Sequence, residues 1–221
     1  GGVGGERAAG PPNPGAGWGG TAAEKPTAAE LLEQLGQHNI QVRTQATLQL
    51  QQLPAAAEFS AALTSSNNER QRAHLLWVLA LQQALSPEQL QAAVRDESLL
   101  VRTHAARVLG AQPELDPQRS ALSRLLEDES PMVRRAAAKA ASRSLHPALL
   151  SPLWQQLRQA AKDPADGHLL HMLKIAVRNH LRDLDPESLP RFSLSTLVRE
   201  QPQLATQLAV GVNNVRGAAL A

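Results

Sequence analysis

Apolar residues recur along this chain at the spacing of one helical face, and the recurrence is itself repeated. In the stretch 96–110, apolar residues such as Val101 and Ala105 follow an opening Asp-Glu-Ser. The stretch 128–142 repeats this arrangement 32 residues later. Side chains spaced three and four residues apart lie on one face of an α-helix. A period of this length without strand-like alternation indicates stacked helical units.

Residues that favour helix ends divide these units into predicted helices. Thr27 opens a capping box, and Ser98 and Ser130 each offer a hydroxyl to the N–H groups of a first turn. Gly110 is expected to end the helix that Ser98 opens, because glycine readily adopts the left-handed conformation at helix C-termini. Asp116, which precedes a proline, is expected to open another helix in the same way.

Arginine occupies equivalent places in four of the units. These residues are separated by intervals of 29, 30 and 32 residues, and they are Arg43, Arg72, Arg102 and Arg134. A fifth copy that begins at Asp166 has an acidic residue where the arginine is expected. Four matching units and one degenerate unit indicate a repeat array.

The pattern Asp-x-x-x-x-Val-Arg-x-x-Ala-Ala-x-x-Leu-Gly at 96–110 resembles the second-helix signature of HEAT repeats. The resemblance implies an all-α fold, a right-handed α-solenoid of about five antiparallel helix pairs. It also implies that Asp96 and Asp128 lie in turns within repeats, and that the four arginines stack in a ladder which these acids help to neutralise. The resemblance covers residues 26–183 well and the C-terminal part weakly.

Three shorter segments resemble part of a particular group of large exported bacterial proteins, described as membrane-bound dehydrogenase-like. These segments begin at Glu30, Arg72 and His168. In those proteins a helical segment separates a sugar-dehydrogenase-like β-propeller from a c-type haem domain. The present sequence has no propeller strands and, without cysteine, no Cys-x-x-Cys-His motif. The resemblance implies a spacer from a redox protein, and only through it is a periplasmic or exported location expected.

The composition agrees with a helical array. Aromatic residues make up 2% of the 221 residues and tyrosine is absent, so leucine, alanine and valine must build the core. The most apolar predicted helix runs from Asn68 to about Leu85. With 22 basic against 20 acidic residues, the charge balance argues against a strong nucleic-acid footprint. No apolar run is long enough to span a bilayer, and cysteine-based metal sites are excluded.

The sequence divides into three expected regions. Residues 1–25 are rich in glycine and proline and are predicted to be a flexible linker. Residues 26–184 are predicted to form the repeat array, and residues 185–221 a helical extension that is expected to be truncated. An apolar stripe around Leu204, Leu208 and Val212 is expected to lack a neighbour in that extension.

The arginine series permits two interpretations. The four arginines could line a groove that captures phosphates or acidic peptides. The favoured interpretation is an internal ladder neutralised by aspartates and helix-end carbonyls. Arg135, Lys139 and Arg143 add positive charge to one helix, which is typical of a solvated face. Trp77 and Trp154 are more often core residues than binding platforms.

Histidines are the remaining candidates for a site. His168 and His171 are three residues apart on one predicted helix, with His180 further along it, so they could contribute to a metal site. His74 and His104 occupy the same place in neighbouring units and could lie close together. Core or groove positions are favoured for all of them, because the spacing supplies no third ligand.

No nucleophile elbow, phosphate-binding loop, zinc-binding HExxH or paired-carboxylate motif occurs in the sequence. The preferred interpretation is a non-catalytic scaffold or protein-interaction module without a cofactor, whose partner is another protein or a neighbouring domain of the same chain. The alternative is a nucleic-acid-binding protein or a DNA glycosylase, since some alkylpurine glycosylases resemble HEAT arrays.

Overall fold

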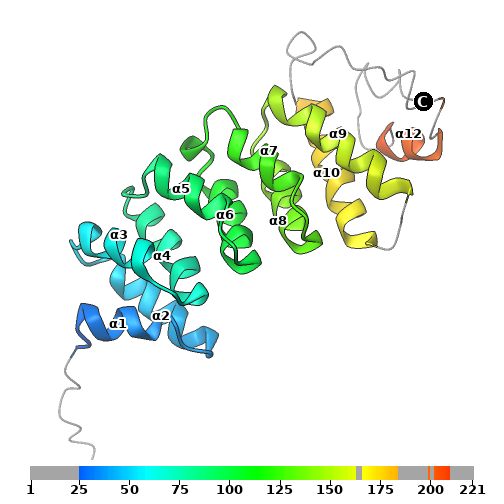
Figure 1. Ribbon diagram of the computed structural model, residues 1–221. Helices are drawn as coiled ribbons and strands as arrows, with labels where there is room; N and C mark the ends of the chain where they lie inside the picture. The colour runs from blue at the N-terminus through cyan, green and yellow to red at the C-terminus, as the bar shows by residue number, and fades with distance from the viewer. Residues whose placement is uncertain (1–24, 163–165, 184–198, 200–201, 210–221) are drawn as a thin grey trace, which may run out of the picture.

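The computed structural model describes residues 25–162, 166–183, 199 and 202–209, which form an elongated stack of α-helix pairs (Figure 1). Within these ranges the chain contains eleven α-helices, one short 3-10 helix and no strand, so the predicted all-α fold is confirmed. The expectations for residues 1–24, and for most of residues 185–221, lie outside the described residues.

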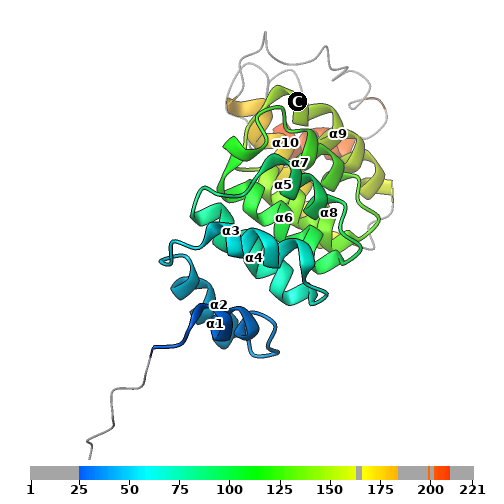
Figure 2. The same cartoon turned by 60° about the vertical axis from the view of Figure 1, so that its left-hand side comes forward.

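The helices of the array form two layers. The first-helix layer contains α1 (Ala28–Gln34), α3 (Ala56–Ser65), α5 (Pro87–Val94), α7 (Ser120–Leu126) and α9 (Pro147–Lys162). The second-helix layer contains α2 (Ile40–Leu50), α4 (Glu69–Leu81), α6 (Leu99–Ala111), α8 (Pro131–Ala141) and α10 (Gly167–Asp183). Each second helix contacts its own first helix and the second helix of the next pair, which continues the stack from α1 to α10 (Figure 2).

Helix starts follow the capping residues closely. Thr27 and Ser86 form complete capping boxes at α1 and α5. Asn39 and Ser98 accept hydrogen bonds from the first turns of α2 and α6. Ser130 stands at the N-cap of α8 but makes no such side-chain bond, so the prediction of a hydroxyl cap there is wrong.

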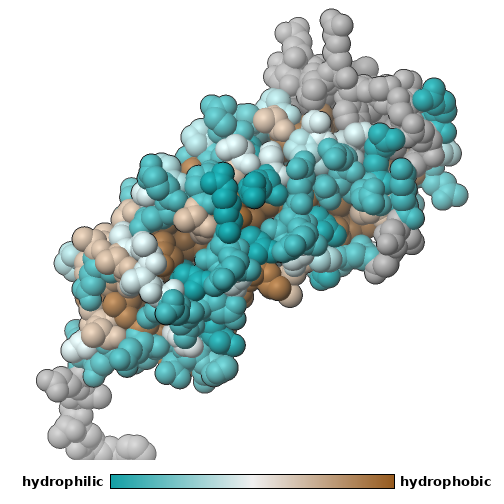
Figure 3. All heavy atoms as spheres, in the orientation of Figure 1, coloured by the Kyte–Doolittle hydropathy of each residue, from teal (hydrophilic) through white to brown (hydrophobic). Residues whose placement is uncertain are grey.

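The core is built from leucine, alanine and valine along the seam between the layers, with Phe59 as a fully buried aromatic. The face in Figure 3 is largely polar, with smaller apolar patches among the polar side chains. Small residues set the helix spacing at one point. A Cβ atom on Gly110 would lie 2.9 Å from the Cβ of Ala140, so this glycine permits the close approach of α6 and α8. Gly110 lies inside α6 and has no positive φ, so its predicted role as a helix stop is wrong.

Helix α4 ends at Leu81, four residues before the predicted end. Gln83 adopts a left-handed conformation with φ of 56° just beyond this end. The N–H of Ala84 donates to the carbonyl of Leu79 and that of Gln83 to Ala80, which is the Schellman arrangement. Glutamine rarely takes this conformation, so the sequence contained no signal for the stop.

Helix α7 also begins later than predicted. It starts at Ser120, and the preceding Arg119 has a left-handed φ of 59°. Asp116 is buried and accepts a hydrogen bond from the N–H of Leu122 at 2.9 Å. Asp116 therefore accepts a hydrogen bond from the first turn of α7, although it lies before the N-cap residue, Arg119.

Beyond the array, α12 (Pro202–Ala209) packs against α10. Leu204 and Leu208 are buried, so the expectation that their apolar stripe lacks a neighbour is wrong. Lys174 donates to the side chain of Gln207 at 2.6 Å and Arg178 to its carbonyl at 3.1 Å. This helix thus covers part of α10.

Candidate functional site

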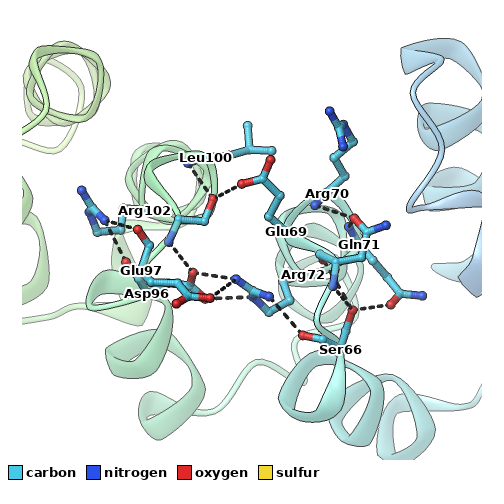
Figure 4. Close-up of polar contacts among 11 residues, drawn as sticks. Ser66, Glu69, Arg70, Gln71, Arg72, Asp96, Glu97, Leu100 and Arg102 are labelled. Carbon is cyan, nitrogen blue, oxygen red and sulfur yellow. Dashed lines mark hydrogen bonds and ion pairs between the residues drawn. The ribbon is translucent and has the colours of Figure 1, made fainter.

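The arginines of the repeat units point into the turns between helices. Arg72 extends from α4 toward the turn before α6, where its Nε and Nη2 atoms donate to the two carboxylate oxygens of Asp96 at 3.0 and 2.9 Å (Figure 4). Its Nη1 donates to the carbonyl of Ser66 at 3.1 Å. The arginine of one repeat therefore holds the turn of the next.

Arg102 makes the same connection one repeat later and is 8% exposed. Its Nε and Nη2 atoms donate to the carboxylate of Asp128 at 2.7 and 3.1 Å. Its Nη1 donates to the carbonyls of Asp96 and Glu97 at 2.9 and 3.0 Å. The hydrogen bond with Asp128 raises the pKa of the Arg102 guanidinium, which remains charged despite its burial.

The other two arginines of the series lack a carboxylate partner in the described part of the chain. Arg134 donates only to the carbonyls of Asp128 and Glu129, at 2.7 and 2.8 Å. Arg43 donates to the carbonyls of Gln37 and His38. Both therefore bond to the carbonyls of their own turns.

Asp166 has a different place from the one predicted. It precedes the first residue of α10 and accepts a hydrogen bond from the N–H of Leu169 at 2.9 Å. Its partner is Arg135, whose Nε lies 3.0 Å from the carboxylate. Asp166 is therefore the turn acid of the fifth unit, and its assignment to the arginine position is wrong. Its hydrogen bond from Leu169, more than the one from Arg135, lowers the pKa of this carboxyl group.

His74 is held as a neutral ring between two units. Its Nε2 accepts a hydrogen bond from the Nε of Arg43 at 3.1 Å. Its Nδ1 lies 3.0 Å from the hydroxyl of Thr47, which itself donates to the carbonyl of Arg43. Since Nε2 accepts, Nδ1 carries the proton and donates to Thr47. Burial, followed by the charge of Arg43, lowers the pKa of His74 to about 4.

His104 lies beside His74, with the ring centroids 5.7 Å apart, as the aligned spacing predicted. Its Nδ1 accepts a hydrogen bond from the indole N–H of Trp77 at 3.0 Å. Burial is the largest cause that lowers the pKa of His104 to about 4, and Arg107, His74 and Arg43 add to it. A hydrogen-bond donor occupies one ring nitrogen of each histidine, which favours a structural pair over a metal-ligand pair.

The three histidines of α10 differ in their exposure to solvent. His168 and His171 are exposed, whereas His180 is fully buried and its Nδ1 lies 2.8 Å from the carbonyl of Ala176. Within the described ranges, no group of three or more histidine, aspartate and glutamate side chains is arranged to hold a metal ion. No helix in those ranges is both long and apolar enough to cross a bilayer.

A groove with a volume of about 520 Å³ runs across α4, α6, α8 and α10. Four of its lining residues are small, namely Gly110, Ala111, Ala136 and Ala140. The others have longer side chains: Trp77, Arg107, Met132, Arg135, Lys139, Arg143, His168 and Met172. None of these lining residues is acidic, so the groove combines positive charge with apolar surface.

Charge is also distributed unequally between the two layers. The second-helix layer carries eleven lysines and arginines but only two acidic residues, Glu69 and Asp183. The first-helix layer carries three basic and four acidic residues. Within the helices, basic residues are therefore concentrated in the second layer, although aspartates of the adjoining turns pair with Arg72, Arg102 and Arg135.

A family model described as HEAT repeats matches residues 86–174, which span α5 to α9 and the first part of α10. Over this stretch the chain is similar to HEAT repeats. The comparison with curated proteins gave no match. Neither comparison supports the narrower resemblance to dehydrogenase-associated proteins, whereas the HEAT resemblance rests on both the match and the helix pairs.

The groove includes residues that the sequence interpretation did not select. Arg107, Met132 and Met172 were not identified, and Lys139 and Arg143 were assigned to a solvated face. One signal was present in the sequence, because Arg107 and Lys139 are 32 residues apart and so occupy the same place in successive repeats. A repeated exposed cation at one register position indicates a shared face.

Proposed function

We propose that this chain is a non-catalytic protein-interaction module that binds a partner segment on its second-helix layer. The observation that carries the proposal is the basic, partly apolar groove across α4 to α10. The repeat arginines contribute little to it, because Arg72 and Arg102 bond to aspartates and carbonyls of the turns. The available charge belongs to the groove cations, which frame small and apolar residues.

A protein partner suits this surface better than a nucleic acid. The turns that border the second-helix layer carry Glu97 and Glu129, whose side chains are 93% and 87% exposed. These carboxylates oppose a long phosphate backbone that extends along the layer beyond the groove, whose lining includes neither of them. The groove also contains methionine and tryptophan side chains, which adapt to apolar partner residues and are enriched in protein interfaces.

Selection of binders to the full chain from a displayed library of random peptides tests this proposal. Peptides enriched on the wild-type chain are measured against two charge-reversal variants. The groove variant combines Arg107→Glu and Lys139→Glu, and the control combines Arg124→Glu and Lys162→Glu on exposed positions of the first-helix layer. We expect the groove variant to lose binding and the control to retain it.

Equal binding of the enriched peptides to both variants would place the interaction elsewhere and refute the proposal. Titration with duplex DNA tests the competing function. Tight binding whose affinity falls steeply with salt would favour a nucleic-acid surface, because each neutralised phosphate releases counterions.

A further inference from the structure

We propose that the groove recognises an acidic peptide segment that carries an apolar anchor residue. This inference rests on the proposed function and specifies the chemistry of the partner. Two properties of the groove lead to it: cations that have no partner among the described residues, and a pair of methionines that line the groove together with a fixed tryptophan.

Three groove cations are free to bind a ligand. Arg107, Lys139 and Arg143 are exposed, and among the described residues none of their side chains forms an ion pair or hydrogen bond. Arg135 differs, because Asp166 already neutralises it at 3.0 Å. The free cations therefore require counter-charges from solvent or from a partner, and the groove lining supplies no carboxylate.

The positions of these cations suit a short segment with several carboxylates. Lys139 lies in α8, and Arg143 follows four residues later, just beyond its end. At a rise of about 1.5 Å per helical residue, the two Cα atoms are separated by roughly 6 Å along the axis. Arg107 extends from the neighbouring helix α6. Glutamate or aspartate side chains on successive turns of a peptide helix have a similar spacing.

The apolar half of the groove is formed by an unusual concentration of side chains. The chain contains two methionines, Met132 and Met172, and both line this groove. Met132 is 50% exposed although it is a large apolar side chain. Trp77 lines the same groove, and its hydrogen bond to His104 fixes the indole ring. Flexible thioethers beside a fixed aromatic ring suit an inserted leucine or phenylalanine.

A small set of labelled synthetic peptides tests the inference on the full chain by fluorescence anisotropy. The first peptide has glutamates at helical spacing around a leucine-phenylalanine pair. The second replaces the glutamates with glutamine, and the third replaces the apolar pair with alanine. We expect only the first peptide to bind measurably, and its affinity to fall as salt rises.

Substitutions of groove residues show which side chains contact the first peptide. Arg107→Gln, Lys139→Gln and Arg143→Gln should each weaken the first peptide about three- to fivefold, as expected for an exposed charge pair. Met132→Ala should weaken it independently of salt, because its contact is apolar. Arg124→Gln on α7 serves as the matched control and should leave the affinity unchanged. Circular dichroism and thermal melts of all variants exclude unfolding as the cause.

Three outcomes overturn the inference. Equal binding of the glutamine peptide would remove the requirement for acid, and equal binding of the alanine peptide would remove the requirement for an anchor. Displacement of the first peptide by low concentrations of oligonucleotide would show that the site prefers phosphate. If library-selected peptides bind in the groove but are neither acidic nor apolar, only this inference fails and the proposed function stands.

Discussion

Replacement of Arg102 offers a quantitative test of how the repeats are joined. Arg102→Ala removes the paired hydrogen bonds to Asp128 and leaves that carboxylate, whose side chain is 9% exposed, without its cation. The carbonyls of Asp96 and Glu97 lose their donor as well. Loss of one partner from a buried ion pair costs about 3–5 kcal/mol. Since Asp128 keeps its hydrogen bond from the N–H of Ser130, we expect about 3 kcal/mol.

Arg134 provides a matched control within the same array. Arg134 is the fourth residue of its helix, as Arg102 is of α6, and it donates to the carbonyls of Asp128 and Glu129. It has no carboxylate partner among the described residues. Arg134→Ala should therefore cost about 1 kcal/mol, the value of a hydrogen bond lost near the surface. The difference of roughly 2 kcal/mol isolates the contribution of the carboxylate pair.

Urea unfolding followed by far-UV circular dichroism measures both free energies. A double-mutant cycle with Asp128→Asn separates the pairwise energy from the cost of each single change. Because repeat arrays can unfold in stages, a second probe such as tryptophan fluorescence must give the same transition. Equal losses for Arg102→Ala and Arg134→Ala, or a loss below about 0.5 kcal/mol for the former, would refute the argument.

Three further predictions concern stability. Because the pKa values of His74 and His104 are about 4 in the folded chain, against an ordinary histidine value of 6.5, the unfolded chain binds more protons between these two pH values. The free energy of unfolding should therefore fall by on the order of 2 kcal/mol per histidine as pH decreases from 6.5 to 4, and His74→Gln should reduce this dependence in urea titrations. Gly110→Ala should destabilise the chain by about 1–3 kcal/mol through a clash with α8, whereas Gly167→Ala, which meets nothing within 4 Å, should be neutral or stabilising in thermal melts. Gln82→Ala should cost about 1 kcal/mol because Nε2 of this residue donates to three carbonyls at the end of α2, and no change in the urea midpoint would contradict this.

Much of the fold could be predicted because the residues that define each repeat act on neighbouring residues in the sequence. Capping residues such as Thr27 and Ser98 act on the turn that follows them, so their effect can be read locally. The resemblance to HEAT repeats, rather than the spacing alone, led to the expectation that Asp96 and Asp128 lie in turns and help to neutralise the arginine series. Helix ends that depend on a tertiary contact were not accessible in this way, and Gly110 was assigned to a stop when it is required for packing against α8.

The errors near the fifth unit have a different cause. Helix α9 contains 16 residues, whereas α7 contains 7, so the period lengthens before Asp166. A fixed interval from Arg134 then aligned Asp166 with the wrong position. The groove was not predicted because its lining combines short and long side chains from several helices, whose arrangement appears only in the folded chain. Lining residues such as Ala136 and Ala140 resemble ordinary core residues in sequence, and only the stacking of the helices shows that they share a groove with Lys139.

The two arginine–aspartate connections also bear on how strain and unfolding pass along the array. Asp96 and Asp128 each accept the N–H of a serine in their own turn and an arginine from the preceding repeat, so each turn is shaped by two units at once. In a one-dimensional array such a contact is a nearest-neighbour coupling, and it makes adjacent repeats open together. Arg43 has no such acid in the described chain, and the pair of Arg135 with Asp166, which joins α8 to the turn before α10, is more exposed than the other two. The coupling is therefore strongest from α4 to α8, and hydrogen exchange should find a cooperative central block with more weakly coupled units on either side.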